Sequence, residues 1–146
     1  MREQTCETLH RAEPRLTALD VFVPGPLSNP LNGSRGHWSK HARWARQWRD
    51  RAGLVLLEAR TRQPRRSWPW APELPKLVMF QCHVWSLFDD DALPGICKPI
   101  RDALVDARVI DGDAPGHGHG FAYTQTINRQ ARGVRITIAG LGEAAR

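Results

Sequence analysis

Four segments of the chain alternate apolar with polar side chains at the period of two that is typical of a β-strand. The clearest is residues 76–87, in which Val78, Phe80 and Cys82 fall on one side. The predicted strands are residues 16–23, 76–87, 121–127 and 134–138. Because only residues 128–133 separate the last two segments, we expect those two strands to form a closing hairpin.

Two other segments repeat apolar residues every three or four positions, which predicts helices that each bury one face. The first covers residues 39–60 and carries Trp44 and Trp48 on its apolar stripe. The second covers residues 93–108, where Pro99 fits an α-helix only within the first turn. Both helices are therefore expected to pack on the predicted strands.

The element order β-α-β-α-β-β predicts an α+β fold, in which a mixed sheet packs against two main helices. A length of 146 residues suits a single domain with a core that needs no covalent staples. We find no internal repeat and no sign of a second domain. The expected organisation is a flexible N-terminal tail at residues 1–15, a domain at residues 16–139 and a C-terminal tail at residues 140–146.

Composition excludes several classes of protein. With 41% hydrophobic and 25% charged residues the chain is in the range of soluble globular domains. No apolar run approaches the ~20 residues that a membrane span needs, and residues 1–15 contain no hydrophobic stretch suited to a signal peptide. Cys6, Cys82 and Cys97 lack metal-site spacing, and the last two fall in apolar segments that suit core positions. We therefore expect a cytoplasmic protein with reduced thiols and no membrane partner.

The net charge of +6 combines two unlike halves of the chain. Residues 1–72 carry 13 basic and six acidic side chains, whereas residues 73–146 carry eight basic and nine acidic ones. Arginine accounts for most of the basic residues, and its planar fork binds phosphate oxygens in pairs. A GC-rich genome would produce the same excess of arginine. The basic half therefore indicates either a phosphate-bearing partner or a solvated basic surface.

If the partner is DNA, the basic side chains in and around the first predicted helix are the candidate phosphate contacts. These residues are Arg35, Lys40, Arg43, Arg46, Arg65 and Arg66. Trp38, Trp68 and Trp70 lie in predicted loops near arginines, where they could stack on unpaired bases or cover the edge of the core.

Six aspartates surround the second predicted helix. They are Asp89, Asp90 and Asp91 before it, Asp102 within it, and Asp111 and Asp113 after it. Carboxylates packed together are unfavourable unless a cation joins them, and Mg²⁺ is typically held by one or two carboxylates together with substrate phosphates. The first three could instead cap the helix amides, a common role of acidic residues at that position.

In the order of these acidic motifs the chain resembles the RusA-type endodeoxyribonucleases, which are Holliday-junction resolvases of phages and prophages. The matching segments are residues 89–93 (DDDAL), 98–104 (KPIRDAL) and 109–113 (VIDGD). The upstream half is also similar to the phage branch of that family, which shares a strand, a Pro-rich turn, Ser28-Asn29, His37-Trp38 and a basic helix. The resemblance covers about residues 16–138. Ala92 stands where the family motif has asparagine.

The resemblance implies roles for individual residues. Asp89, Asp91 and Asp113 would bind Mg²⁺, for which Mn²⁺ could substitute, and Lys98 would stabilise charge on the scissile phosphate or orient the attacking water. Asp113 is preferred to Asp111 as a ligand because its distance from Lys98 along the chain is similar to that in the family. Asp102 and Asp111 would then contact these groups without binding the ion or the phosphate themselves. Asp102 would pair with Lys98, one helical turn away.

The function implied by the resemblance is Mg²⁺-dependent hydrolysis of phosphodiesters in branched DNA during recombination and repair, performed by a homodimer across a four-way junction. Two alternatives remain open. Ala92 favours a catalytically degenerate, DNA-binding relative, and the acidic cluster alone would also suit a metal-dependent phosphohydrolase that acts on small nucleotides.

Overall fold

The computed structural model describes residues 17–29, 38–63, 69 and 71–141. The predicted N-terminal tail at residues 1–15 lies outside these residues, as do Arg35, Arg65 and Arg66 among the candidate DNA contacts, and Trp68 and Trp70. In the described part of the chain, no helix is both long enough and apolar enough to cross a membrane.

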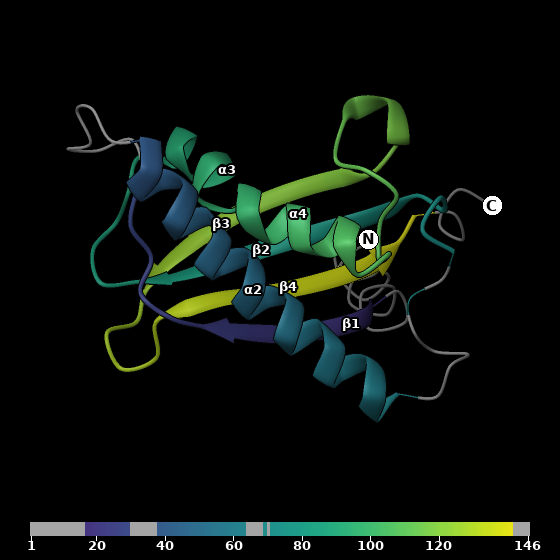
Figure 1. The fold of residues 1–146 in the computed structure, drawn as a ribbon, viewed down its shortest axis with the longest axis horizontal. Helices are drawn as coiled ribbons and strands as arrows, with labels where there is room; N and C mark the ends of the chain where they lie inside the picture. Colours follow the sequence, from purple (N-terminus) through teal and green to yellow (C-terminus); the bar gives the residue numbers. More distant parts are fainter. Residues whose placement is uncertain (1–16, 30–37, 64–68, 70, 142–146) are drawn as a thin grey trace, which may run out of the picture.

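A four-stranded mixed sheet forms one layer of the protein (Figure 1). Its strands are β1 (Thr17–Pro24), β2 (Lys76–Val84), β3 (Gly120–Ile127) and β4 (Gly133–Gly140). The order across the sheet is β1-β4-β2-β3, with β4 antiparallel to both β1 and β2, and β3 parallel to β2. This arrangement confirms the predicted α+β class, the element order and the mixed sheet.

The predicted closing hairpin is wrong, because β2 lies between β3 and β4. The loop between them crosses the end of β2, where the main-chain N–H of Asn128 donates to the oxygen of Val84 at 2.9 Å. β4 is an inner strand whose Val134 and Ile136 are fully buried, whereas β3 is an edge strand with no fully buried side chain. A period of two identifies a strand but carries no information about its neighbours, so the short connection misled the prediction.

Helix α2 (Trp38–Arg62) matches the first predicted helix within two residues at each end. The second predicted helix is broken into α3 (Leu93–Ile96) and α4 (Lys98–Asp106), with Cys97 between them. Pro99 accordingly lies in the first turn of α4, as predicted, because a proline deeper in a helix would remove a hydrogen bond. Two short 3₁₀ turns, η1 (Asp90–Ala92) and η2 (Pro115–His117), were not predicted.

Both main helices cover the same face of the sheet (Figure 1). The core between them is built from Trp48 of α2, Ile100 and Leu104 of α4, and Phe80 and Ile136 of the sheet, all at most 2% exposed. The apolar stripes predicted for the two helices are the faces that are buried. Because α2 and α4 pack on this shared core, they lie side by side. The candidate site described below includes residues from the outer surfaces of both helices.

The two described cysteines are core residues. Cys82 of β2 and Cys97 are fully buried, both are free thiols, and their sulfur atoms lie 3.6 Å apart. The hydrogen bond with the Cys82 thiol, followed by burial, raises the pKa of Cys97, so this side chain is neutral at physiological pH. The prediction that both are small buried residues is confirmed.

Candidate functional site

The acidic turn, residues 89–91, connects β2 to the helical segment. Asp89 precedes η1, and its main-chain oxygen accepts the N–H of Ala92 at 3.0 Å, but its carboxylate caps no main-chain N–H. All three aspartates are exposed. Within the described residues, no hydrogen bond or ion pair engages the carboxylates of Asp89 and Asp91. The capping alternative therefore does not describe these two carboxylates, which are accessible to an external ligand.

Gln125 of β3 holds the turn against the sheet. Its Nε2 donates to the main-chain oxygen of Phe88 at 2.8 Å and to Oδ1 of Asp90 at 3.0 Å. Its Oε1 accepts the N–H of Phe88 at 3.0 Å. One side-chain amide thus fixes the entry to the turn and the middle aspartate. Sequence reasoning missed Gln125, since nothing in a polar position of an edge strand marks it as a support for a distant turn.

Lys98, Asp102 and Asp113 meet at the start of α4. Lys98 Nζ donates to Oδ1 of Asp102 at 2.8 Å and to Oδ2 of Asp113 at 2.6 Å. Asp102 is one helical turn further along, whereas Asp113 reaches Lys98 from the loop that follows α4. The hydrogen bond to Asp102, followed by that to Asp113, raises the pKa of Lys98. Lys98 is therefore a charged ammonium held between two carboxylates.

Arg101 is a second cation on Asp113, and sequence reasoning missed it. Its Nε lies 3.3 Å from Oδ2 of Asp113, and its guanidinium donates to the hydroxyl of Tyr123. The guanidinium also lies over the rings of Phe121 and Tyr123, 5.7 and 5.8 Å from their centroids. Its side chain is only 14% exposed. The available signal was its position three residues after Lys98, which places both cations on neighbouring parts of one helix surface.

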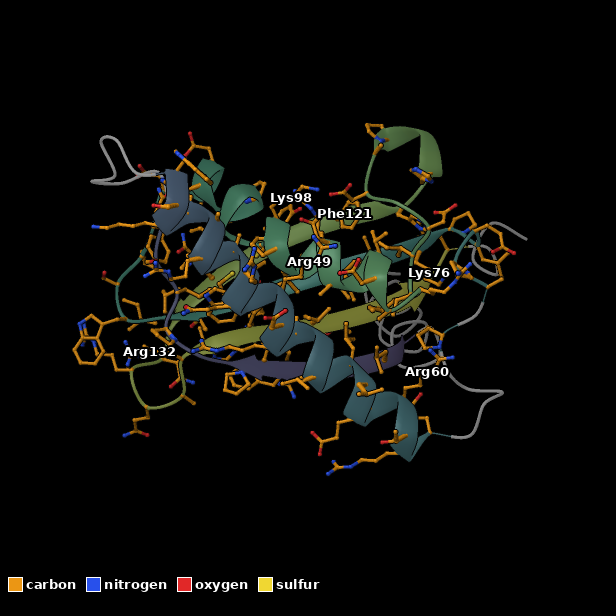
Figure 2. All side chains as sticks on the ribbon, viewed as in Figure 1. Arg49, Arg60, Lys76, Lys98, Phe121 and Arg132 are labelled. Atoms are coloured by element: carbon orange, nitrogen blue, oxygen red, sulfur yellow. The ribbon has the colours of Figure 1, made fainter. Side chains whose placement is uncertain are left out.

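The same interactions set the charge on Asp113. The hydrogen bond from Lys98 is the largest cause of a lowered pKa at this carboxyl, and Arg101 lowers it further. Both cations bind Oδ2, so neither of them occupies Oδ1. Asp113 is thus an ionised carboxylate with one oxygen held by the protein, beside Lys98 (labelled in Figure 2).

Asp111 lies in a different set of contacts from Asp113. Its Oδ1 is 2.7 Å from Nε2 of His119 and 3.2 Å from Nδ1 of His117. The main-chain N–H of Lys76 donates to Nδ1 of His119, so Nε2 carries the proton and donates to Asp111. The bond from His119 is the largest cause of a lowered pKa at Asp111. Of the two aspartates weighed as a metal ligand, the structure brings Asp113 to Lys98 and leaves Asp111 with the histidines.

The three predicted metal ligands, Asp89, Asp91 and Asp113, have the oxygen donors that Mg²⁺ prefers. In the part of the chain that the structure describes, no three His, Cys, Asp or Glu side chains are grouped so that they could hold a metal ion. Mg²⁺ usually keeps several waters and takes one or two carboxylates together with substrate phosphates. The donors therefore fit the ion in kind, but a closed cage of three carboxylates is not preformed.

The basic face of α2 flanks this site. Lys40, Arg43 and Arg46 are exposed on α2, as the helical pattern predicts. Arg46 and Asp102 line one cavity of about 220 Å³ between α2 and α4. A candidate phosphate contact and a residue that binds Lys98 thus open onto the same hollow.

Arg49 continues the basic lining of this cleft and was not identified from the sequence. Its guanidinium binds Asp106 in a two-pronged pair, with Nε 2.5 Å from Oδ2 and Nη2 2.7 Å from Oδ1. It lines both the cavity beside Asp102 and a second cavity of about 320 Å³ that also includes Arg60. The two cavities share Arg49 and both lie between α2 and α4, lined on the α2 side by Arg46, Arg49 and Arg60. Together they are named the α2–α4 cleft below.

No protein-family model matches the chain, and no curated protein matches it either.

Proposed function

We propose that this chain is a metal-dependent endodeoxyribonuclease of the RusA type that cleaves branched DNA by hydrolysis of phosphodiesters. The observation that carries the proposal is the convergence on Lys98. Asp102, from the second matching motif, and Asp113, from the third, bind the same ammonium at 2.8 and 2.6 Å. Lys98 and Asp113, 15 positions apart along the chain, thus join the second motif to the third through a cation of the kind that stabilises phosphoryl transfer.

In this proposal, three aspartates would bind the metal ion and Lys98 would stabilise the transition state. Bound Mg²⁺ would supply a nucleophilic water at neutral pH and neutralise charge on the phosphate. Asp89 and Asp91 would bind the ion through carboxylates that no described residue engages, and Asp113 would add Oδ1. Lys98, kept charged by its two carboxylate partners, would stabilise the negative charge that develops on the scissile phosphate.

The α2–α4 cleft supports a nucleic-acid substrate for this site. Exposed Arg46 presents a planar fork of the kind that binds phosphate oxygens, whereas the fork of Arg49 is bound to Asp106. Exposed Lys40 and Arg43 extend the basic surface along α2. A polyanion lying on α2 would reach Asp102, and hence Lys98, through the cavity that Arg46 and Asp102 share. In this proposal the protein acts as a homodimer, because the resolution of a four-way junction requires two nicks.

Ala92 favours one alternative. The family motif has asparagine at this position, and a chain without that amide could retain the DNA surface and lack catalysis. In this case the protein would be a junction-binding relative of the nucleases. The nuclease and the junction-binding protein would both bind the four-way junction, but only the nuclease would produce nicked DNA.

One assay separates these functions. The purified protein is incubated with a synthetic four-way junction, a linear duplex of the same sequence and nucleoside triphosphates, in Mg²⁺ or in EDTA. Nicks confined to the junction and to the Mg²⁺ samples are the expected result. Tight junction binding without product at any Mg²⁺ or Mn²⁺ concentration would favour the binding protein. Hydrolysis of the nucleotides alone would point to a small-molecule phosphohydrolase.

A further inference from the structure

Trp85 is an exposed tryptophan flanked by two arginines, outside the site described above. It follows directly on β2 and is 57% exposed. The guanidinium carbon of Arg129 lies 5.1 Å from the Trp85 ring centroid, and that of Arg132 lies 5.8 Å away. Both arginines come from the loop between β3 and β4. A large apolar ring is thus left open to solvent and accompanied by two positive charges.

Hydrogen bonds fix the loop that carries the two arginines relative to Trp85. Arg129 Nε donates to the main-chain oxygen of Trp85 at 3.2 Å. The N–H of Ala131 donates to Oδ1 of Asn128 at 3.1 Å, which closes the turn of the loop. The main-chain oxygen of Arg132 accepts the N–H of Gly25 at 3.0 Å. These bonds hold the main chain of the loop that carries both arginines against Trp85 and Gly25.

No carboxylate of the described residues neutralises the charge of the two arginines. Among the described residues, no ion pair involves Arg129 or Arg132, whereas Arg49 and Arg101, which line the candidate site, each bind an aspartate. Guanidinium groups that already lie against a π face and lack a carboxylate are suited to an anionic group that arrives with an aromatic ring.

The patch lies toward the same end of the molecule as the start of α2, on which the DNA is proposed to lie. Trp85 lies four residues before Asp89, and Leu87 between them is 60% exposed. Figure 2 shows Arg132 at the end of the molecule opposite to Lys76, where β2 begins, and to Arg60, in the last turn of α2. The first turn of α2, with Lys40, therefore lies toward the same end as the patch.

We propose that Trp85, Arg129 and Arg132 form a binding site for an unpaired nucleobase and its phosphate in a single-stranded segment of DNA. The indole ring would stack on the base, and the arginines would bind the adjacent phosphate or cover the other face of the base. This inference rests on the proposed function only in taking DNA as the partner, and it does not depend on catalysis.

The test measures binding in EDTA, so that cleavage plays no part. Two fluorescent 12-nucleotide probes are compared by anisotropy, oligothymidylate and an abasic oligonucleotide with the same number of phosphates. Trp85→Ala is expected to weaken the binding of oligothymidylate by about tenfold or more and to leave the abasic probe unchanged. Trp85→Phe is expected to restore most of the loss. The Arg129→Ala/Arg132→Ala double variant is expected to weaken both probes.

The controls separate this patch from the rest of the basic surface. Arg62→Ala removes an exposed arginine at the far end of α2, and it is expected to change neither affinity appreciably. Equal affinity of the wild type and Trp85→Ala for oligothymidylate would overturn the inference, as would an equal loss on both probes. If junction nicking is observed and Trp85→Ala binds normally, only the patch is refuted. If Trp85 matters and no nicking occurs, the proposed function is refuted and the patch stands.

Discussion

Lys98 Nζ donates a hydrogen bond of 2.6 Å to Oδ2 of Asp113. The two residues are 15 positions apart along the chain, because the rest of α4 and the start of the following loop lie between them. This bond ties the first residue of the helix to the loop that follows it, whereas Asp111 of the same loop is bound by His117 and His119. Because Arg101 binds the same oxygen, Asp113 is the point at which the loop is fixed to α4.

Asp113→Asn is expected to reduce the free energy of unfolding at neutral pH and to change its dependence on pH. Lys98 lowers the pKa of Asp113 in the folded state below its ordinary value of 3.8. A depressed carboxyl pKa stabilises the protein above the unfolded-state value, and this contribution is lost as the pH falls through the folded-state value. The difference between wild type and variant in urea denaturation is therefore expected to be constant from pH 7 to about 5 and to shrink below about pH 4. A difference that grows on acidification contradicts the assigned ion pair.

Lys98→Met is expected to lower the rate of junction cleavage by about 100- to 1,000-fold, because it removes a positive charge aimed at the transition state. Junction affinity in EDTA is expected to change little, because Lys98 is one of many basic groups. Lys40→Met, which removes a charge of the same type on α2, serves as the matched control and is expected to reduce affinity more than the rate at saturating protein. Full cleavage activity in Lys98→Met would remove Lys98 from the mechanism.

Gln125→Ala is expected to loosen the acidic turn. The substitution removes three hydrogen bonds to Phe88 and Asp90, and it should cost about 1–3 kcal/mol of stability. If the turn binds Mg²⁺, the concentration of Mg²⁺ needed for half-maximal cleavage should rise several-fold. Thr124→Ala on the same strand is the control, since its hydroxyl makes only a long bond to the oxygen of Phe80, at 3.5 Å. An unchanged Mg²⁺ requirement in Gln125→Ala would separate the turn from the metal.

The Arg43→Ala/Arg46→Ala double variant is expected to flatten the dependence of junction affinity on salt. Each phosphate contact contributes ~0.9 to the slope of log affinity against log salt, so the loss of two should reduce the slope by about 2. Arg62→Ala, whose guanidinium binds Glu58 at the other end of α2, should leave the slope unchanged. If the double variant keeps the wild-type slope, α2 does not lie on the DNA.

The elements of the fold could be predicted from periodicity because the buried stripes are strongly patterned. Trp48 and Leu56 of α2, and Val78 and Phe80 of β2, fall where the periods of 3.6 and two place them, and all are buried. The neighbours of β4 could not be predicted in this way. Its place between β1 and β2 depends on which strands pair with its main-chain N–H and C=O groups, and alternation along one strand does not specify that choice.

The candidate site could be predicted only where one element contains the whole interaction. The spacing of four residues between Lys98 and Asp102 already implies their contact on a helix. The contacts of Asp113 with Arg101, and of Asp90 with Gln125, join residues 12 and 35 positions apart and depend on how the chain folds back. Trp85 was not singled out in the sequence because it falls within the predicted strand at residues 76–87, whereas β2 ends at Val84, the last position that pairs with β3.

The most direct test of the proposed nuclease compares Asp91→Asn with Asp90→Asn on a four-way junction in Mg²⁺. The two aspartates are adjacent, but the carboxylate of Asp90 is bound by Gln125 whereas that of Asp91 is engaged by no described residue. We expect paired nicks from the wild type, paired nicks at a reduced rate from Asp90→Asn, and no nicks from Asp91→Asn. The affinity for the junction should be similar for all three proteins. Undiminished nicking by Asp91→Asn, or no nicking by the wild type in either Mg²⁺ or Mn²⁺, would contradict the proposal.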